Sequence, residues 1–384
     1  MAGVLSGVKV LDLGHFVAGP FTSALLGDLG ATVIKVESLG GDRLRSAKSA
    51  SFAASNRGKQ SVAIDLKSPA GKQAFERGCA WADVIHHNLR PSAAERLGID
   101  GATLRQQWPH LVVLETSAYG SKGPDSHRGG FDIILQALTG HLSYLGGKSS
   151  VPIADRVLQV DYGSGMIASL AISAALLRRR RSGQGASIEI ALIDTAAFLM
   201  SEVVRQGSGD IIGSHPVNSS LTGRGPCERI YRTADGWLAV VALDEQSATA
   251  FVTALNLQPF GQPSAEWGDL EQKLIEDAIG HRETEDLTAA LRSAGVWCEP
   301  CPPDARRQLP QDPVLVNRGA VVVDQDPVYG TKLDLGLGTS PDGDFDARGR
   351  GHLDELGEHT RSVLDEWGLT SEEIDGLYAD GIVK

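Results

Sequence analysis

The sequence predicts an α/β protein whose large domain is built on a mainly parallel β-sheet with helices on both faces. Three observations lead to this prediction. Short apolar runs typical of buried strands recur along the N-terminal half, segments with helical spacing separate them, and prolines and glycines stand where those helices would begin and end. Strands that alternate with helices are joined by right-handed crossovers, which places the strands in parallel.

The first strand, helix and strand occupy residues 8–37. Residues 8–13 read VKVLDL, and after GHFVAG, Pro20 stands where a helix would begin. The next residues, FTSALLGDL, have helical spacing and end at Gly30, which suits a helix C-terminus. ATVIKVE then has the composition of a strand.

A second and a third cycle follow. Ser68 can cap a helix that begins at Pro69 and runs to Ala82, and ADVI then forms a strand that ends in a polar turn at 86–88. A short helix around 93–97 precedes a third strand, LVVLET, at 111–116. Ligands of such sheets bind outside the carboxyl ends of the strands. The segments of interest therefore follow Leu13, Glu37, Ile85 and Thr116.

The remaining chain divides into further segments. Residues 161–180 predict a helix rich in small residues, whose closing arginines suit a helix C-terminus, and SIEIAL and LIDTAAFLM predict a strand and a helix. ERIYRTADGWLAVVAL predicts a hairpin with its turn at 234–236, followed by helices to about residue 293. A Gly/Pro/Asp-rich stretch covers 336–351, and two helices close the chain. The predicted parts are a large domain (1–205), a linker (206–221), a small α+β domain (222–305) and a closing segment (306–384).

Composition and charge exclude several classes of protein. The 384 residues are 42% hydrophobic and 22% charged, as in ordinary globular proteins, and a net charge of −12 argues against general binding to nucleic acids or anionic membranes. The longest apolar stretch, at 166–177, is shorter than the roughly 20 residues of a membrane span. The start, MAGVLSGVKVLDLG, lacks a basic signal region, and four cysteines indicate no disulfide framework. We therefore expect a cytoplasmic protein.

Several short motifs favour a structural interpretation. Cys298 and Cys301 form a C-x-x-C without a second pair for zinc, and the adjacent His86 and His87 lack evident partner ligands, so no metal is expected. Neither a P-loop nor a G-x-S-x-G motif is present. GHFVAG follows the first strand in place of G-x-G-x-x-G, which weakens a nicotinamide-binding interpretation.

Basic residues gather near the predicted ligand edge of the sheet. Local cationic loops in an acidic chain can bind a polyphosphate, and arginine suits this role because of its bidentate hydrogen bonds. A solvated surface explains the same composition equally well. These residues are Lys35, Arg43, Arg45, Lys48, Arg57, Lys59, Arg90 and Arg96.

Asp161 precedes Tyr-Gly-Ser-Gly at the start of a predicted helix. By itself this pattern favours an ordinary N-cap. The alternative is an ionised carboxylate held at a helix N-terminus, where Gly163 and Gly165 let a substrate approach the backbone. Such a carboxylate can attack an acyl thioester and form a covalent intermediate, with backbone N–H groups of the glycine turn stabilising the oxyanion.

Segments spread over nearly the whole chain have an order and spacing that are together specific. They are VKVLDLGHFVAGPFTSALLGDLGATVIKVES, NRGKQSVAIDLKSPAGK, ADVIHHNLRPSAAERLGI, YGSKGP, GGFDIILQALTG, LIDTAAFLM, IYRTADGW and LGEHTRSVLDEWGLTSEEI. In these segments the chain resembles the family III CoA-transferases. This is the CaiB/BaiF group, which includes formyl-CoA and carnitine-CoA transferases and the related α-methylacyl-CoA racemases.

The resemblance implies a Rossmann-like large domain formed by the N-terminal half and the C-terminal segment, a small domain near 222–305, and an interlocked homodimer. It also implies acyl-CoA and a small carboxylic acid as substrates. Ser38 departs from the family pattern, since many relatives carry an arginine there, and Arg43 or Arg45 is the candidate replacement. The positions that match the family's CoA-binding loops are Phe16, Val17, Ile64, Lys67, Asn88, Leu89 and Arg96, and Arg43 and Arg90 join them as nearby cations.

The resemblance also assigns the catalytic aspartate to Asp161. Racemases of the family pair this aspartate with the histidine of a Gly-His-Asp segment, because moving a proton across a carbon needs an acid and a base. The matching segment here is Gly130-Phe131-Asp132, and phenylalanine transfers no proton, so CoA transfer is favoured. Two alternatives stay open: a 2-methylacyl-CoA racemase that uses His127 or His141, and a CoA-binding homologue without activity.

Overall fold

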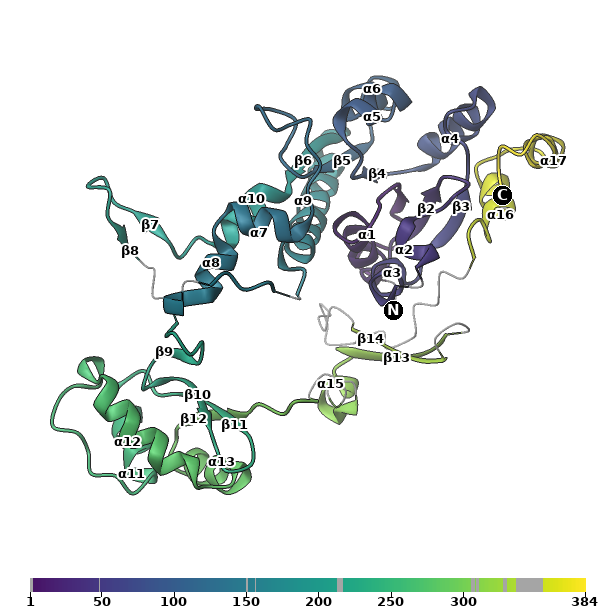
Figure 1. The fold of residues 1–384 in the computed structure, drawn as a ribbon. Helices are drawn as coiled ribbons and strands as arrows, with labels where there is room; N and C mark the ends of the chain where they lie inside the picture. Colours follow the sequence, from purple (N-terminus) through teal and green to yellow (C-terminus); the bar gives the residue numbers. More distant parts are fainter. Residues whose placement is uncertain are drawn as a thin grey trace. The chain divides into compact units, whose positions relative to one another are not determined.

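The computed structural model describes residues 3–47, 49–149, 151–155, 157–212, 217–304, 308, 311–326, 330–335 and 355–384 (Figure 1). The chain forms two compact units. Residues 140–155 and 200–205 belong to the second unit, although the predicted large domain (1–205) includes them, and residues 306–311 of the predicted closing segment belong to it as well. Unit 1 comprises Met1–Thr139, Arg156–Leu199 and Asp312–Lys384, and unit 2 comprises Gly140–Asp155 and Met200–Gln311.

Unit 1 contains the predicted parallel sheet. Its six strands lie in the order β3-β2-β1-β4-β5-β6, and every neighbouring pair is parallel. This is the strand order of a Rossmann fold, in which the order reverses between β1 and β4. The predicted fold class is confirmed. The strands are β1 (Lys9–Asp12), β2 (Thr32–Glu37), β3 (Gln60–Ala63), β4 (Val84–His87), β5 (Val112–Ser117) and β6 (Ala186–Ala191).

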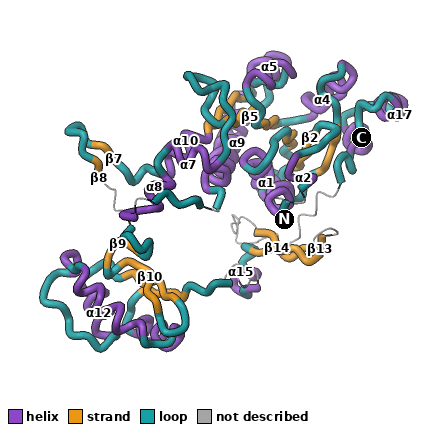
Figure 2. The backbone as a smooth tube through the Cα atoms, viewed as in Figure 1, coloured by secondary structure: helices purple, strands orange, loops and turns teal. Residues whose placement is uncertain are grey.

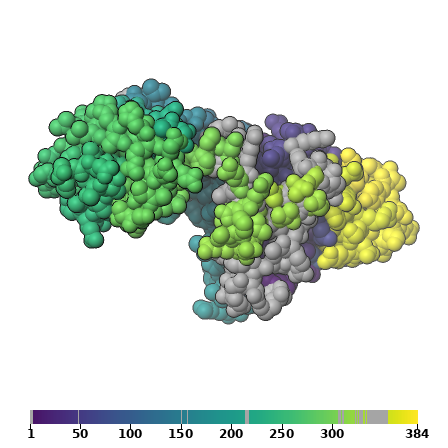
Figure 3. All heavy atoms as spheres, turned by 90° about the horizontal axis from the view of Figure 1, so that it is seen from below, coloured from purple at the N-terminus to yellow at the C-terminus, as the bar shows by residue number. Residues whose placement is uncertain are grey.

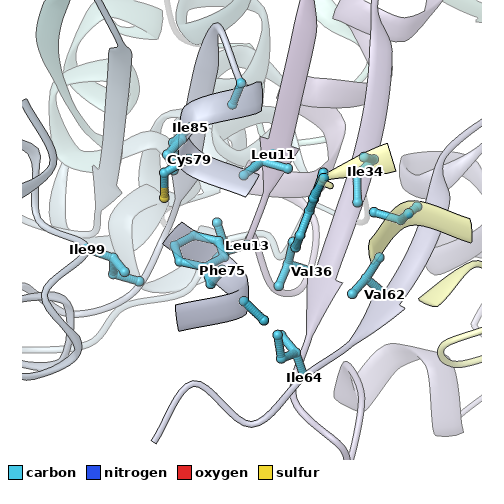
Figure 4. Packing of buried hydrophobic residues seen from close by; sticks show 14 of the residues in the cluster. Leu11, Leu13, Ile34, Val36, Val62, Ile64, Phe75, Cys79, Ile85 and Ile99 are labelled. Atoms are coloured by element: carbon cyan, nitrogen blue, oxygen red, sulfur yellow. The ribbon is translucent and has the colours of Figure 1, made fainter. Parts of the chain in front are cut away.

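Alternate residues of the strands enter two separate hydrophobic cores. Leu11, Ile34 and Ile85 face one core, which Figure 4 shows packed around Phe75. Their neighbours Val10, Val33 and Val84 face the other core. A strand buried on both faces has no polar alternation, which is why these segments are continuous apolar runs. Burying one such side chain contributes about 1.5–3 kcal/mol.

Helices cover both faces of the sheet, and Figure 2 shows them in purple around the orange strands. One core takes side chains from α4, α5, α6, α16 and α17, and the other from α1 and α9. The helices of unit 1 are α1 (Ala18–Asp28), α2 (Arg43–Ser46), α3 (Ala50–Asn56), α4 (Pro69–Trp81), α5 (Pro91–Leu97), α6 (Gly101–Gln107), α7 (Asp132–Leu138), α9 (Gln159–Ser182), α10 (Leu192–Leu199), α15 (Pro313–Asn317), α16 (Thr360–Glu366) and α17 (Ser371–Ala379). The hairpin of β13 (Val321–Asp326) and β14 (Gly330–Leu335) also belongs to unit 1.

The C-terminal segment packs on the edge strand β3. The N–H of Ser61 donates to Nδ1 of His359 at 3.2 Å, and the N–H of Ala63 donates to Oγ1 of Thr360 at 3.1 Å. Ile64 forms a bridge with Val383. The chain end thus supplies the hydrogen bonds that an exposed strand edge would lack.

Local sequence signals fixed most helix ends. The Ser68 hydroxyl accepts the N–H of Gly71, and Gly183 ends α9 with φ of 72°. Arg179 near that end pairs with Asp83 at 2.7 Å, which agrees with a structural role for the arginine run. The predicted polar turn at 86–88 is wrong at its start. His86 and His87 are the last residues of β4 and are 0% and 1% exposed.

Unit 2 contains the predicted hairpin. β10 (Glu228–Arg232) and β11 (Trp237–Val241) pair antiparallel across a turn at 233–236. Helices α11, α12 and α13 cover one face of the four-stranded sheet and share a hydrophobic core with it. In Figure 3 the side chains of these residues are closely packed green spheres. The remaining elements of unit 2 are α8 (His141–Gly146), η1 (Gly147–Ser149), β7 (Val204–Arg205), β8 (Ile211–Ile212), β9 (Gly223–Gly225), α11 (Glu245–Ala254), η2 (Ser264–Glu266), α12 (Asp269–Gly280), α13 (Thr284–Ser293) and β12 (Trp297–Pro300). The Gly/Pro/Asp-rich stretch at 336–351 lies outside the described residues.

Helix α9 is longer than the apolar run that marks it in the sequence. It has 24 residues, and it is the one helix of the described ranges whose length and composition would allow it to cross a membrane. Ala168, Ile172 and Leu176 are buried in the core beneath the sheet. We therefore interpret α9 as a core helix with one exposed apolar face.

Candidate active site

A cleft lies at the carboxyl ends of β1, β4 and β5. It lies where the strand order reverses, which is the usual position of a ligand site in such a sheet. The walls come from the loops after these strands, from residues 128–131, and from α9 and α10. The lining residues are Phe16, Ala18, Asn88, Leu89, Arg90, Pro91, Thr116, Ser117, Ala118, Arg128, Gly129, Gly130, Phe131, Asp161 and Leu192.

Side chains from neighbouring elements hold the loop after β1. The amide of Asn88 makes two hydrogen bonds with His15: its Oδ1 accepts the N–H at 2.7 Å, and its Nδ2 donates to the C=O at 2.8 Å. The N–H of Phe16 donates to Oδ2 of Asp42 at 3.1 Å. Phe16 has a φ of 63°, a left-handed conformation that is unusual for this residue type. These hydrogen bonds compensate for that strain and fix the floor of the cleft.

A buried ion pair lies beneath this loop. Lys59 donates to Oδ2 of Asp12 at 2.7 Å, and both side chains are 0% exposed. Burial lowers the pKa of Lys59 to about 7 despite the nearby carboxylate. Burial acts to raise the pKa of Asp12, but the charges of Lys59 and Lys35 outweigh it and hold that pKa well below its usual range. Lys35 donates to the C=O of Gly14 at 2.7 Å, so the charged network supports the loop directly.

Asp161 lines the cleft as a half-buried carboxylate in the first turn of α9. The N-cap interpretation of Asp161 is wrong, because α9 begins at Gln159 and its N-cap is Leu158, which has no capping side chain. Asp161 is the third helical residue. The Asp161 side chain therefore does not cap the helix N-terminus. It lies in the cleft, where a bound substrate can reach it.

The two glycines after Asp161 have a different role from the predicted one. Both lie inside α9 rather than in a turn, so an oxyanion site made of their N–H groups is not supported. A Cβ on Gly165 would lie 2.8 Å from the ring of Phe21 and 3.3 Å from the C=O of Ala18. A Cβ on Gly163 would lie 3.1 Å from a methyl group of Thr195. The glycines therefore allow α1 and α10 to pack closely against α9.

The environment of Asp161 favours its neutral form. Burial, and secondly the charge of Asp132, raise the pKa of Asp161 to about 7. Oδ2 of Asp132 accepts the N–H groups of Val160 at 2.8 Å and of Asp161 itself at 3.0 Å. A displaced carboxylate pKa inside a cleft is typical of functional sites.

The structure brings together about half of the residues predicted to form the site. Phe16, Asn88, Leu89, Arg90 and Asp161 line the same cleft. The other predicted residues lie outside this lining. Val17 is buried at the N-terminus of α1, the side chain of Ile64 is in the core at 1% exposure, and Arg43, Lys67 and Arg96 are exposed.

The two arginines considered as replacements at Ser38 differ in their contacts. Arg45 pairs with Glu37 at 2.6 Å. Burial acts to raise the pKa of Glu37, but the hydrogen bond and charge of Arg45, the charge of Lys35 and the N–H of Asp42 together outweigh it and lower that pKa. Arg43 is exposed on the same short helix. Arg43 is therefore the better candidate for contact with a bound anion.

Sequence reasoning missed part of the cleft wall. Thr116, Ser117 and Ala118 come from the carboxyl end of β5 and its exit, and Gly129 and Gly130 precede α7. The end of β5 was one of the segments of interest, but no motif marked Thr116, Ser117 or Ala118, whereas Gly129 and Gly130 belong to the GGFDIILQALTG segment that carries the family resemblance. A Cβ on Gly129 would lie 2.9 Å from the guanidinium of Arg90, so the glycine lets this cation pack against the wall.

Phe131 is the residue that the family resemblance matches to the racemase histidine. Its side chain is 59% exposed and lines the cleft. Its ring meets that of Phe16 edge to face, with centroids 5.4 Å apart. The two rings form an apolar wall, and neither ring transfers a proton.

The motifs given a structural interpretation fit that role. Nε2 of His87 lies 3.1 Å from the C=O of Ile99, and burial lowers its pKa to about 4. Cys298 is buried, Cys301 is exposed, and neither is in a disulfide. Among the described residues, no three His, Cys, Asp or Glu side chains are grouped to hold a metal ion.

Comparison with known proteins places the chain in a family. Residues 5–340 match the model of CoA-transferase family III. The chain is 30% identical to α-methylacyl-CoA racemase of Mus musculus over 99% of this chain and 98% of the relative. It is 33% identical to succinyl-CoA:glutarate CoA-transferase of Mus musculus over 66% of this chain and 60% of the relative. A crystal structure of a CAIB/BAIF family protein from Brucella suis is 26% identical, with a TM-score of 0.81 over 96% of this chain and 100% of that protein. The protein belongs to CoA-transferase family III.

Proposed function

We propose that this protein transfers CoA from an acyl-CoA donor to a carboxylic acid, with Asp161 as the nucleophile. The observation that carries the proposal is the half-buried Asp161 carboxylate in the cleft at the switch point of the sheet. The family match and the transferase relative support the same reaction class.

The proposed reaction proceeds by four acyl transfers. The Asp161 carboxylate attacks the donor thioester carbon, and the C–S bond breaks to give a mixed anhydride and CoA thiolate. The thiolate attacks the Asp161 carbonyl and releases the donor acid, which leaves an aspartyl-CoA thioester. The acceptor carboxylate attacks this thioester, forms a second anhydride and releases thiolate, which then takes the acceptor acyl group and restores Asp161. Each step exchanges acyl bonds of high energy, so the cycle needs no nucleotide hydrolysis.

The cleft offers a placement for the acyl-CoA substrate. We propose that the pantetheine arm passes Phe16, Asn88 and Leu89 and that the phosphate groups meet exposed cations. Ala18 lines the cleft, and no side chain caps α1 within the described part of the chain. The first turn of α1 is therefore our proposed source of N–H groups for the oxyanion. The exposed cations are Arg43, Lys67, Arg90 and Arg96.

Racemisation is the second candidate reaction, because two relatives are named racemases and because a carboxyl group with a pKa of about 7 can exchange protons. Proton movement across a carbon also needs a partner on the opposite side. Phe131 cannot supply it. His127 is exposed outside the cleft lining, and His141 belongs to unit 2, where it is buried.

One experiment distinguishes these reactions. The protein is incubated in heavy water with a panel of acyl-CoA donors, including a 2-methylacyl-CoA, with and without carboxylic acids, and thioesters are identified by mass. We expect new thioesters only when an acid is present, and no deuterium at C2 of the donor. Deuterium uptake without an acid would identify a racemase. If no donor exchanges its acyl group or its proton, the chain is a CoA-binding homologue without activity.

An exposed apolar face on unit 1 supports the proposed homodimer. Helices α7, α9 and α10 lie together in Figures 1 and 2 and expose large apolar side chains. Large apolar side chains exposed on helices that pack together are typical of a protein interface. We propose that a second copy of the chain covers it. The residues are Ile133, Ile134, Leu138, Met166, Leu170, Leu177, Phe198 and Leu199, with exposures between 39% and 70%.

Replacing Leu170 by aspartate is expected to weaken this dimer. Leu170 is 70% exposed in the single chain, so the change costs the monomer little, whereas a buried unpaired charge at an interface is strongly unfavourable. Sedimentation velocity should show a dimer for the wild type and a shift to monomer for Leu170→Asp, with an unchanged circular dichroism spectrum. A wild-type monomer at micromolar concentration would contradict the proposal.

A further inference from the structure

Asp132 places a second carboxylate at the helix end that carries Asp161. Asp132 is the first residue of α7 and is 4% exposed. Its Oδ2 accepts the N–H of Val160 at 2.8 Å and that of Asp161 at 3.0 Å, and its Oδ1 accepts from the side-chain amide of Gln136. Leu158 provides no side-chain cap. Asp132, which lies 29 positions before Asp161 in the sequence, caps α9 instead.

This arrangement removes the usual stabilisation of a carboxylate at a helix N-terminus. The positive end of a helix stabilises a nearby negative charge through its free N–H groups. Here Asp132 accepts two of those groups, and the N–H of Tyr162 donates to the C=O of Leu158. Asp161 is therefore close to a fixed negative charge while the N–H groups that would offset this repulsion are engaged.

The other charged groups on elements packed against α9 have partners elsewhere or lie at the surface. Oδ1 and Oδ2 of Asp28 on α1 pair with Arg57, and Asp194 on α10 is exposed. Glu115 on β5 lies beside Gly101, and Glu189 on β6 accepts from the Ser121 hydroxyl at 2.8 Å. On α9 itself the neighbouring titratable group is Tyr162, and burial, then the charge of Asp161, raise its pKa.

We propose that Asp132 is a positioning residue that destabilises ionised Asp161 and thereby favours its acylation. This inference rests on the proposed function. The form of the Asp161 side chain that attacks is the negative carboxylate, whereas the mixed anhydride and the aspartyl-CoA thioester are neutral. Repulsion from Asp132 therefore acts on the free enzyme and is relieved when the new C–O or C–S bond forms. The same hydrogen bonds hold the backbone of Asp161 in place.

Asp132→Asn tests the effect of the Asp132 charge apart from its role as the helix cap. The asparagine Oδ1 can still accept the two N–H groups, whereas the negative charge is lost. Asp132→Ser is a second variant, since a serine hydroxyl also caps a helix. Asp194→Asn is the matched control, because it removes one negative charge from a helix packed against α9 but lies at the surface.

The first measurement needs no turnover. Protein labelled with ¹³C at the aspartate carboxyl groups is titrated by NMR, and the Asp161 signal is assigned by its absence in Asp161→Asn. We expect a midpoint near pH 7 for the wild type and for Asp194→Asn. For Asp132→Asn and Asp132→Ser we expect a midpoint lower by about one unit. Since burial is the larger cause of the displaced pKa, only part of the displacement should be lost. An unchanged midpoint in both folded Asp132 variants would overturn the inference.

The second measurement is the fraction of enzyme trapped as the aspartyl-CoA thioester. After incubation with a donor acyl-CoA at a pH well above 7, where Asp161 is ionised in both proteins, and reduction with borohydride, we expect about tenfold less adduct relative to free enzyme in Asp132→Asn, because one pKa unit corresponds to a factor of ten. An equal adduct fraction in wild type and variant would also overturn the inference. If the wild type forms no adduct while the midpoint still falls in the variants, the proposed function is wrong but the effect of Asp132 on Asp161 stands.

Discussion

Replacing Asp161 by alanine is expected to reduce CoA transfer by at least about 10⁴-fold, which is the scale of losing a covalent nucleophile. CoA binding should remain largely intact, because the proposed contacts to CoA come from the loops after β1, β3 and β4 and from exposed cations. Transfer is measured as the initial rate of new thioester formation, and binding by isothermal titration with CoA.

Asp375→Asn is the control for this substitution. Asp375 lies on α17, is exposed, and pairs with Arg361 at 2.8 Å, so its loss removes a carboxylate from the surface of the same unit. This variant should retain wild-type turnover. If Asp161→Ala turned over at the wild-type rate, the mechanism proposed here would be wrong.

Replacing Lys59 by methionine is expected to lower the free energy of unfolding by about 3–5 kcal/mol, which is the usual effect of removing one partner of a buried ion pair. Lys59 Nζ donates to Asp12 at 2.7 Å, to the C=O of Pro20 at 2.8 Å and to Asn56 at 2.9 Å. Methionine fills a similar volume but leaves the Asp12 carboxylate buried without the cation that is hydrogen-bonded to it. Urea unfolding followed by fluorescence and circular dichroism measures the change.

Arg361→Met is the comparison for the buried pair. Arg361 and Asp375 are 2.8 Å apart, but their side chains are 56% and 65% exposed, and such surface pairs contribute about 0–1 kcal/mol. We therefore expect a small effect there and a large one at Lys59. A loss below about 1 kcal/mol in Lys59→Met would show that the buried charges are not needed to hold the loop after β1.

Most of the parallel sheet was predictable because its strands are buried on both faces. Strands β1, β2, β4 and β5 each contain consecutive branched apolar residues, and residues such as Ser68 and Gly183 mark helix ends. Strand β3 was missed. Its sequence, QSVA, is too short to show a pattern, and its burial depends on α16 and α17, about 300 residues later in the chain.

The site was predictable only in part, because tertiary contacts decide its chemistry. The ends of the strands located the cleft, and the family resemblance singled out Asp161. Sequence spacing treated Asp161 as a possible cap and the glycines after it as a turn, because a helix cap is normally a neighbour in the chain. Here the cap is Asp132, which lies on another helix, and the glycines serve helix packing. Neither the cap by Asp132 nor the packing role of the glycines can be recognised from the neighbouring residues in the sequence.

The central claim is that the acyl group and then CoA become covalently attached to Asp161. Enzyme incubated with donor acyl-CoA is quenched with borohydride and digested, and the peptide that contains position 161 is sequenced by mass spectrometry. The account predicts reduction of the aspartyl thioester to homoserine at position 161, only when donor is present. Continued transfer with an unmodified aspartate at that position, or with a CoA adduct on a different side chain, would contradict it.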